Sequence, residues 1–323
     1  MKREAADLQN AGAWDTPATR DLIARALEED IGAGDLTGRT CVPEEARARG
    51  RFVAQQALVV AGIELLPLVY SLRAASGGGL PGGLESIELK QASGRRARSG
   101  ALLATVAGRA RLLLECERVA LNFLQHLSGV ATLTRRFVEA LSGTGVKILD
   151  TRKTTPGLRH LEKLAVAAGG GTNHRMGLYD AVLIKENYVA AAGGLRKALE
   201  RSKDAARGRP PVSGQSSAGA SRLAGTPGAG SGPQEVEIEV RNLEELAEAL
   251  EAGATAILLD NFPLDAVHQA MAIARGRASI EISGGVTLEN IRAYAEAGPG
   301  FISVGALTHS APAADITFLL DAS

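Results

Sequence analysis

The feature that most constrains the fold is a regular alternation in the second half of the chain. After Gly145, short apolar runs are separated by longer amphipathic segments, and the runs cover residues 146–150, 181–185, 236–240, 256–260, 279–283 and 301–305. Several of the segments end in Ala-Gly or Arg-Gly, which is typical of helices that end at a left-handed glycine. Near-continuous apolar strands indicate a parallel sheet that is covered on both faces. We therefore predict an α/β barrel, which with these runs alone is either incomplete or completed by a strand from upstream.

The part of the chain before Gly145 has a different pattern. From Ala46 to about Gly108, strand-like pieces alternate with glycine-rich turns without repeating as strand–helix pairs, which indicates a separate α+β domain. Apolar spacings of three and four residues predict a short helix over 21–30 that ends at Gly32 and a long helix over 115–141 that ends at Gly143. We predict an N-terminal domain over 16–119 and a barrel domain over 120–323, whose last residues pack back on the N-terminal domain.

One segment of the barrel half has no apolar periodicity. Residues 203–233 are rich in Gly, Ser, Ala and Pro, a composition that cannot support a packed core. We predict a disordered surface insertion there, with a catalytic lid as the alternative.

Composition excludes several classes of protein. Aromatic residues make up only 3% of the chain, so stacking platforms for single-stranded nucleic acid are not expected. The 36 basic and 36 acidic side chains cancel, which favours neither nucleic acid nor membrane as a partner. Cys41 and Cys116 lack the spacing of a zinc site, and neither a signal peptide nor a run of about 18 apolar residues is present. We expect a soluble cytoplasmic protein.

Charged side chains gather where the predicted strands end. In an α/β barrel the carboxyl ends of the strands form the active site, and the residues placed there are Arg152, Lys153, Lys185, Glu239 and Asp260. Each one alone has a simpler explanation, since a terminal lysine is usually solvated and a terminal aspartate is often a helix N-cap. Their coincidence at one edge predicts an active site.

The charges at this edge restrict the class of ligand that the site can bind. His174 and Arg175 join Arg152, Lys153 and Lys185 in a dense basic group, to which Arg118 belongs if the long helix reaches the barrel mouth. Guanidinium groups recognise carboxylates and phosphates through paired hydrogen bonds. Glu239 and Asp260 oppose them and suit ribose hydroxyls, a bound Mg²⁺ or a cationic transition state. The predicted ligand is strongly anionic and sugar-like.

Two glycine loops follow the last two predicted strands. Ser283-Gly284-Gly285 ends one strand and Gly305-Ala306 the other. Loops in these positions commonly bind a phosphate through backbone N–H groups, although glycine also serves simply to form turns. Their pairing predicts a phosphate site.

Seven segments, in order, resemble the quinolinate phosphoribosyltransferase family. The longest is DTRKTTPGLRHLEKLAVAAGGGTNHRMGLYDAVLIKEN at 150–187, and the others lie at 28–37, 117–132, 236–246, 258–261, 282–286 and 304–310. The resemblance implies a TIM-like incomplete barrel of the type II phosphoribosyltransferases with an N-terminal α/β sandwich domain. It also implies a homodimer with shared active sites, with higher oligomers left open.

The same resemblance implies an activity, a transferase that joins quinolinate to the ribose of phosphoribosyl pyrophosphate with loss of CO2. It implies that Arg152, His174, Arg175 and Lys185 bind the quinolinate carboxylates, that Arg118 reaches the partner's site, and that Lys153 lies near both ligands. Glu239 and Asp260 would face the ribose and Mg²⁺, while Ser283, Gly284 and Gly305 would hold the 5-phosphate. Gly285 and Ala306 belong to the same two loops and are expected to bind substrate with them. We expect Lys153, Lys185, Glu239 and Asp260 to be the catalytic set.

Three other functions stay open at this point. A related enzyme of this fold could act on nicotinate, although the number of basic groups favours a dicarboxylate. A barrel lyase or aldolase could use Lys185 as a Schiff base. A non-catalytic relic would bind quinolinate without converting it.

Overall fold

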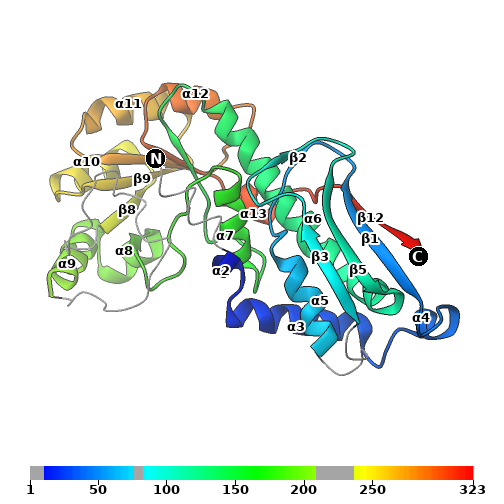
Figure 1. Ribbon diagram of the computed structural model, residues 1–323. Helices are drawn as coiled ribbons and strands as arrows, with labels where there is room; N and C mark the ends of the chain where they lie inside the picture. Colours follow the sequence, from blue (N-terminus) through cyan, green and yellow to red (C-terminus); the bar gives the residue numbers. More distant parts are fainter. Residues whose placement is uncertain (1–10, 76–82, 209–235, 323) are drawn as a thin grey trace. The chain divides into compact units, whose positions relative to one another are not determined.

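A computed structural model describes residues 11–75, 83–208 and 236–322, and these form two compact units (Figure 1). Unit 1 falls within residues 1–135, 155–170 and 310–323, and unit 2 within 136–154 and 171–309. The units therefore interleave along the chain. The predicted domain ranges, 16–119 and 120–323, stay a prediction.

Unit 2 is built on a six-stranded parallel sheet in the order β6-β11-β10-β9-β8-β7. Its strands are β6 (Lys147–Leu149), β7 (Val182–Ile184), β8 (Val236–Val240), β9 (Ala256–Asp260), β10 (Ser279–Ser283) and β11 (Phe301–Ser303). Every apolar run predicted as a strand contains one of these strands, so this part of the prediction is confirmed.

The strand order is that of a barrel opened at one place. β6 pairs with β11, so the first strand of the unit lies beside the last, as in a closed barrel. Between β6 and β7 the described residues form no ladder; Thr172 makes a single parallel bridge with Leu149 instead. The predicted incomplete barrel is confirmed, and among the described residues no upstream strand completes it.

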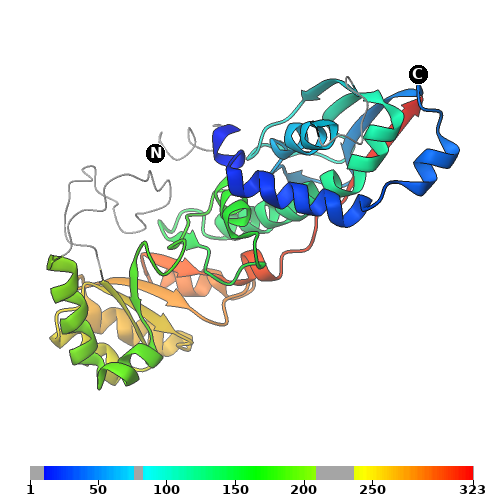
Figure 2. The same cartoon turned by 90° about the horizontal axis from the view of Figure 1, so that it is seen from below.

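Helices cover the outside of this sheet (Figure 2). They are α8 (Glu186–Ala192), α9 (Leu195–Gly208), α10 (Leu243–Glu251), α11 (Leu264–Ala274), α12 (Ile291–Glu296) and α13 (Ala306–His309). α10 begins at Asn242, whose side chain accepts a hydrogen bond from the backbone N–H of Glu245 and so caps the helix. Its buried residues Leu246, Ala249 and Leu250 supply its apolar contact, and the helix lies against β8.

The insertion was predicted to begin at residue 203, which is too early, because α9 extends to Gly208. Residues 203–208 form the last turns of α9, and the ammonium of Lys203 donates to the carbonyls of Ala252 and Gly253 at the end of α10. These contacts with a second helix stabilise the turns despite their polar sequence. The rest of the insertion, 209–233, lies outside the described residues.

Unit 1 combines a four-stranded antiparallel sheet with helices, in the order β12-β1-β5-β3. The strands are β1 (Arg47–Ala54), β3 (Leu84–Leu89), β5 (Leu102–Arg109) and β12 (Ile316–Ala322), and a small second sheet pairs β2 (Leu58–Val59) with β4 (Arg96–Ala97). The C-terminal strand β12 pairs along β1, where the rings of Phe52 and Phe318 lie 4.9 Å apart.

The described helices of unit 1 are α2 (Ala11–Trp14), α3 (Pro17–Ile31), α4 (Leu36–Cys41), α5 (Leu65–Ala75), α7 (Arg159–Ala168) and most of α6 (Ala110–Ala140). The two predicted helices correspond to α3 and α6. α3 ends at Gly32 with a positive φ of 49°, as expected for a glycine stop. α6 starts earlier than predicted because β5 ends at Arg109 and the helix follows without an intervening turn. Among the described residues no helix is long and apolar enough to span a lipid bilayer.

Candidate active site

The candidate site lies at the carboxyl ends of the strands of unit 2. Because all six strands run parallel, these ends meet at one edge of the sheet. The ladder register places Asp260 opposite Ser283 and Ser283 opposite Ser303, so three neighbouring strands bring polar side chains to one level. Asp260 and Ser283, both predicted as site residues, are thus brought together.

A second pair of predicted residues joins two neighbouring strands. Lys185 directly follows β7, Glu239 lies in β8, and the ammonium and carboxylate form an ion pair. The Glu239 side chain is buried, with 8% exposed, while that of Lys185 is 47% exposed. The buried Glu239 carboxylate therefore fixes the position of the Lys185 ammonium, which stays accessible to solvent.

Two arginines of the site interact electrostatically. Arg175 is buried at 7% exposure, and its guanidinium donates to the carbonyl oxygen of Ala181. Burial lowers the pKa of Arg175, and the positive charge of Arg152 lowers it further, while Tyr188, Asp180 and Glu237 act in the opposite direction. Within the described part of the chain, no carboxylate forms an ion pair with Arg175. Two neighbouring guanidinium groups, one of them buried, form a strong site for an anion.

The loop that carries Arg175 is fixed by acidic side chains. The buried carboxylate of Asp150 accepts the backbone N–H of His174 at 2.8 Å. The carboxylate of Asp180 accepts the N–H groups of Met176 and Gly177 at 2.6 and 2.9 Å. The loop thus presents Arg175 from a backbone anchored on both sides.

Lys153 lies beside the loop that follows β11. Its backbone carbonyl accepts a hydrogen bond from the hydroxyl of Thr308 at 2.7 Å. A Cβ atom at Gly305 would lie 3.0 Å from Cδ of Lys153, so the lysine stem passes close over this glycine. Ala306 follows as the first residue of α13. Three predicted site residues, Lys153, Gly305 and Ala306, are therefore neighbours.

The loop after β10 requires a glycine at one position. Gly284 has a φ of 89°, and a Cβ there would lie 2.2 Å from Oδ1 and 2.9 Å from the backbone nitrogen of Asn261. Asn261 itself has a positive φ of 57°, donates its N–H to the carbonyl of Ser283, and donates its amide to the carboxylate of Asp260. The loop and Asp260 therefore form one hydrogen-bonded unit, with Gly285 as its exposed neighbour.

Arg118 is the one predicted site residue outside unit 2. It is exposed on α6 in the part of that helix that belongs to unit 1. Its contribution to a partner's active site stays a prediction.

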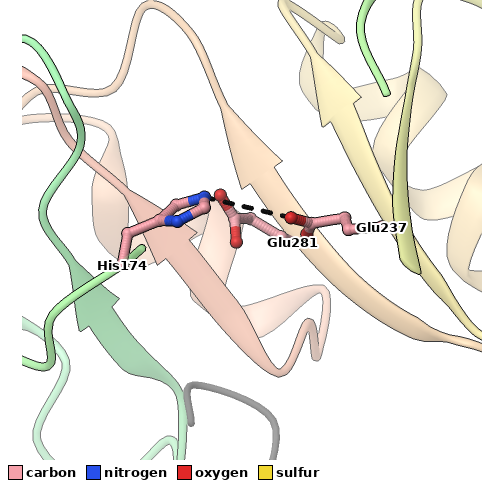
Figure 3. A group of neighbouring side chains, drawn as sticks. All are labelled: His174, Glu237 and Glu281. Atoms are coloured by element: carbon pink, nitrogen blue, oxygen red, sulfur yellow. Dashed lines mark ion pairs between the residues drawn. The ribbon is translucent and has the colours of Figure 1, made fainter. Parts of the chain in front are cut away.

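A buried group that the sequence did not single out lies inside the barrel. Glu237 of β8 and Glu281 of β10 face His174, and potential ligand atoms of the three residues all lie within 4.8 Å of one another (Figure 3). The signal for both glutamates was the alternation of polar and apolar residues in their strands, VEIEV and SIEIS. Alternate residues of a barrel strand face the interior, so these carboxylates are internal rather than solvated.

Both halves of the chain match family models. Residues 35–128 match the family model for the N-terminal domain of quinolinate phosphoribosyl transferase. Residues 130–213 and 228–319 match the model for the C-terminal domain of the same family. Together these matches cover most of the chain.

Individual relatives agree. The chain is 40% identical over 303 residues to the nicotinate-nucleotide pyrophosphorylase [carboxylating] of Mycobacterium leprae, covering 93% of this chain and 96% of that protein. It is 38% identical over 298 residues to the probable nicotinate-nucleotide pyrophosphorylase [carboxylating] of Bacillus subtilis, covering 92% of each. The crystal structure of nicotinate-nucleotide pyrophosphorylase from Ehrlichia chaffeensis is similar with a TM-score of 0.79 at 33% identity, covering 93% of this chain and 98% of that one.

Proposed function

The chain belongs to the quinolinate phosphoribosyltransferase family, and on this premise we propose that unit 2 transfers the phosphoribosyl group of phosphoribosyl pyrophosphate to quinolinate. The products are nicotinate mononucleotide, pyrophosphate and CO2, which makes the protein a pentosyltransferase of NAD biosynthesis. The observation that carries the proposal is the buried Arg175 guanidinium beside Arg152, without an ion-pair partner among the described residues.

This arginine pair fits the two carboxylates of quinolinate. A dianionic ligand relieves the repulsion between the guanidinium groups and compensates the burial of Arg175. Lys185 lies at the adjoining strand end and adds a third cation for the acid. His174, also predicted for the acid, turns its ring toward Glu237 and accepts the backbone N–H of Arg175, so it supports the site through Arg175. The basic side chains orient the pyridine ring so that its nitrogen faces C1 of the ribose, which is a positioning effect.

Glu239 and Asp260 suit the ribose and its charge. Carboxylate oxygens are hard ligands that fit Mg²⁺, and Asp260 lies at the strand ends where the hydrogen-bonded loop of Asn261 holds it. Glu239 is committed to Lys185, so Asp260 is the better candidate to hold the metal, directly or through water. When bound, Mg²⁺ supplies charge neutralisation for the departing pyrophosphate.

The 5-phosphate is assigned to the two glycine loops. Ser283, Gly284 and Gly285 form one and Gly305 with Ala306 the other, and the position of β11 between β10 and β6 supports a shared site. Backbone N–H groups approach an anion closely where no side chain intervenes. Lys153, whose stem crosses Gly305, is placed to serve both the phosphate-bearing donor and the acid.

The reaction then needs no side-chain nucleophile. The quinolinate nitrogen forms a bond to C1 while the C1–O bond to pyrophosphate breaks, and positive charge develops on the ribose near Glu239 and Asp260. The alkylated ring is cationic, so it accepts the electron pair of the C–C bond when the adjacent carboxylate leaves as CO2. A proton then replaces it on that ring carbon.

We further propose a homodimer in which Arg118 reaches the partner's site, and a cytoplasmic location. The dimer rests on the family resemblance, and the location on the expectation from the sequence. Arg118 is exposed on α6, as a residue that acts in another subunit would be in a single chain.

A carboxyl-label assay tests the function. Purified protein with Mg²⁺ should release labelled CO2 from quinolinate only when phosphoribosyl pyrophosphate is present, with one nicotinate mononucleotide formed per CO2. Nicotinate offered in place of quinolinate should not be converted. Conversion of nicotinate without CO2 release from quinolinate would assign the protein to a different acid.

A further inference from the structure

The group of His174, Glu237 and Glu281 lies inside the barrel, and the proposed reaction assigns no role to the two glutamates (Figure 3). All three side chains are buried, with exposures of 7%, 5% and 1%. Glu237 and Glu281 come from β8 and β10, the two strands that flank β9, and both project inward. Burial of a carboxylate is costly in free energy unless the group is paired or hydrogen-bonded, so the surroundings of these two must compensate their charge.

The hydrogen bonds of His174 determine which ring nitrogen carries the proton. Its Nδ1 accepts the backbone N–H of Arg175 at 2.6 Å, so Nδ1 is not protonated. The ring proton is therefore on Nε2, and Nε2 lies 3.9 Å from the Glu237 carboxylate. A metal ion at Nε2 would have to displace that proton, and Nδ1 could take it up only by giving up the Arg175 N–H, so this tautomer argues against a metal centre at the group.

The imidazole thus connects the acidic pair to the anion site. One side of the ring faces the two carboxylates, and the other holds the backbone of Arg175. Arg175 in turn is the buried cation of the candidate site, and the charge of Glu237 is among those that act on it. A displacement of the ring would move Arg175, and a positional error of an ångström is enough to slow an enzyme strongly.

We propose that Glu237 and Glu281 are positioning residues that act through His174 and whose negative charge moderates the affinity of the basic site for its anionic substrate. The inference deepens the proposed function and rests on it. In this arrangement the carboxylates orient the imidazole and so Arg175, and they oppose the binding of an acid that carries two negative charges itself.

The charge and the orientation predict separate effects on two kinetic constants, KM and kcat. Glu237→Gln keeps the size of the side chain but removes its charge. KM for quinolinate should fall about threefold because an opposing charge is gone, and kcat should fall about tenfold because His174 and Arg175 are less firmly held. Damage to the fold alone would raise KM or lower the active fraction, and it would not lower KM.

The experiment compares Glu237→Gln and Glu281→Gln with wild type and with Glu251→Gln, which removes an exposed carboxylate on α10 and should leave both constants unchanged. Steady-state kinetics are combined with ¹⁵N NMR of the histidines, in which the His174 signal is assigned by its loss in His174→Asn. Wild type should show an unprotonated Nδ1 and a protonated Nε2 at neutral pH.

Three results would overturn the proposal. These are a protonated Nδ1 in wild type, unchanged or raised KM in both soluble glutamine variants, and stoichiometric binding of Zn²⁺ or Mn²⁺ to the substrate-free protein that Glu237→Gln abolishes. If wild type fails to convert quinolinate, the proposed function is wrong, whereas the NMR measurement still decides the arrangement of His174. If neither variant folds, the wild-type tautomer and metal titration remain decisive.

Discussion

Lys185 and Glu239 form an ion pair between the neighbouring strands β7 and β8, with the carboxylate buried and the ammonium half exposed. The geometry gives the two residues different uses. A buried carboxylate keeps its position and can stabilise positive charge on a sugar, while the exposed cation can exchange its partner for a substrate carboxylate. The pair therefore joins the two halves of the proposed chemistry.

Replacement of Glu239 by glutamine should reduce kcat by about 100-fold, because a fixed charge aimed at the developing ribose cation is lost. KM for quinolinate should change far less, since the carboxylate faces the other substrate. Steady-state kinetics with each substrate varied in turn separate the two constants. Glu251→Gln is the matched surface control, and an equal loss of activity there would point to general damage.

Arg175→Met should produce a protein that is more stable and inactive on quinolinate. A buried guanidinium beside Arg152 has no ion pair among the described residues, so an apolar side chain of similar length removes an electrostatic penalty of about 1–2 kcal/mol. Thermal unfolding should show a higher Tm for the variant without ligand. Added quinolinate should raise Tm of wild type and leave the variant unmoved, and a lower Tm for the substrate-free variant would contradict this view of the site.

Gly284→Ala should weaken use of phosphoribosyl pyrophosphate and lower stability by about 2–4 kcal/mol, because the added Cβ collides with the backbone of Asn261 at a positive φ. Gly298→Ala is a control with nearly the same φ, 87°, but with no atom within 4 Å of the added Cβ. The difference between the two variants in denaturant unfolding isolates the collision from the backbone strain. Equal losses of stability in the two variants would show that Asn261 shifts enough to avoid the collision.

Much of the barrel could be predicted from the sequence because its strands are buried on both sides. The predicted runs 236–240, 256–260 and 279–283 coincide with β8, β9 and β10 residue for residue. Strand ends of a parallel sheet meet at one edge, so the sequence alone predicts that Lys185, Glu239 and Asp260 lie near one another. Their pairing could not, because the ion pair of Lys185 with Glu239 depends on side-chain rotamers and strand register.

Other features depend on contacts that local pattern does not encode. α7 follows β6 in the chain as a crossover helix of the barrel would, yet it belongs to unit 1. Glu237 and Glu281 were missed because an interior carboxylate has the same spacing as an exposed one on an alternating strand. Only the position of His174 distinguishes the two cases.

Stability at the edge of the barrel should depend on pH through Arg241. Its guanidinium bonds the carboxylate of Glu245 on α10 and that of Glu186 on α8, and the hydrogen bond to Arg241 holds the pKa of Glu245 below its ordinary value. A lowered folded-state pKa gives stability that is present above the unfolded pKa and is lost as pH falls through the folded one. Arg241→Met should therefore lower Tm at pH 7, and the difference from wild type should shrink as the pH falls below the ordinary glutamate pKa. A difference that is constant with pH, or insensitive to salt, would rule out this electrostatic origin.

Mixed dimers provide the test of a shared active site. Arg118 is exposed on α6 of unit 1, whereas the other predicted groups lie in unit 2. In a dimer of one Arg118→Ala and one Glu239→Gln subunit, both changes would therefore fall in the same shared site and leave the other site intact. Each variant alone should be nearly inactive. After subunits are mixed and allowed to exchange, one site of each mixed dimer has both an intact Arg118 and an intact Glu239. A random mixture should recover about a quarter of wild-type activity, because half of the dimers are mixed and each of these has one intact site.

Mixing Arg118→Ala with Arg152→Ala should restore activity to the same extent, since Arg152 also belongs to unit 2. Glu239→Gln mixed with Arg152→Ala serves as the control, because both changes fall in the same unit and no site regains all its groups. No recovery in the Arg118 mixtures after subunit exchange is verified would place Arg118 in its own subunit's site, and recovery in the control would show that Glu239 and Arg152 of one site come from different subunits.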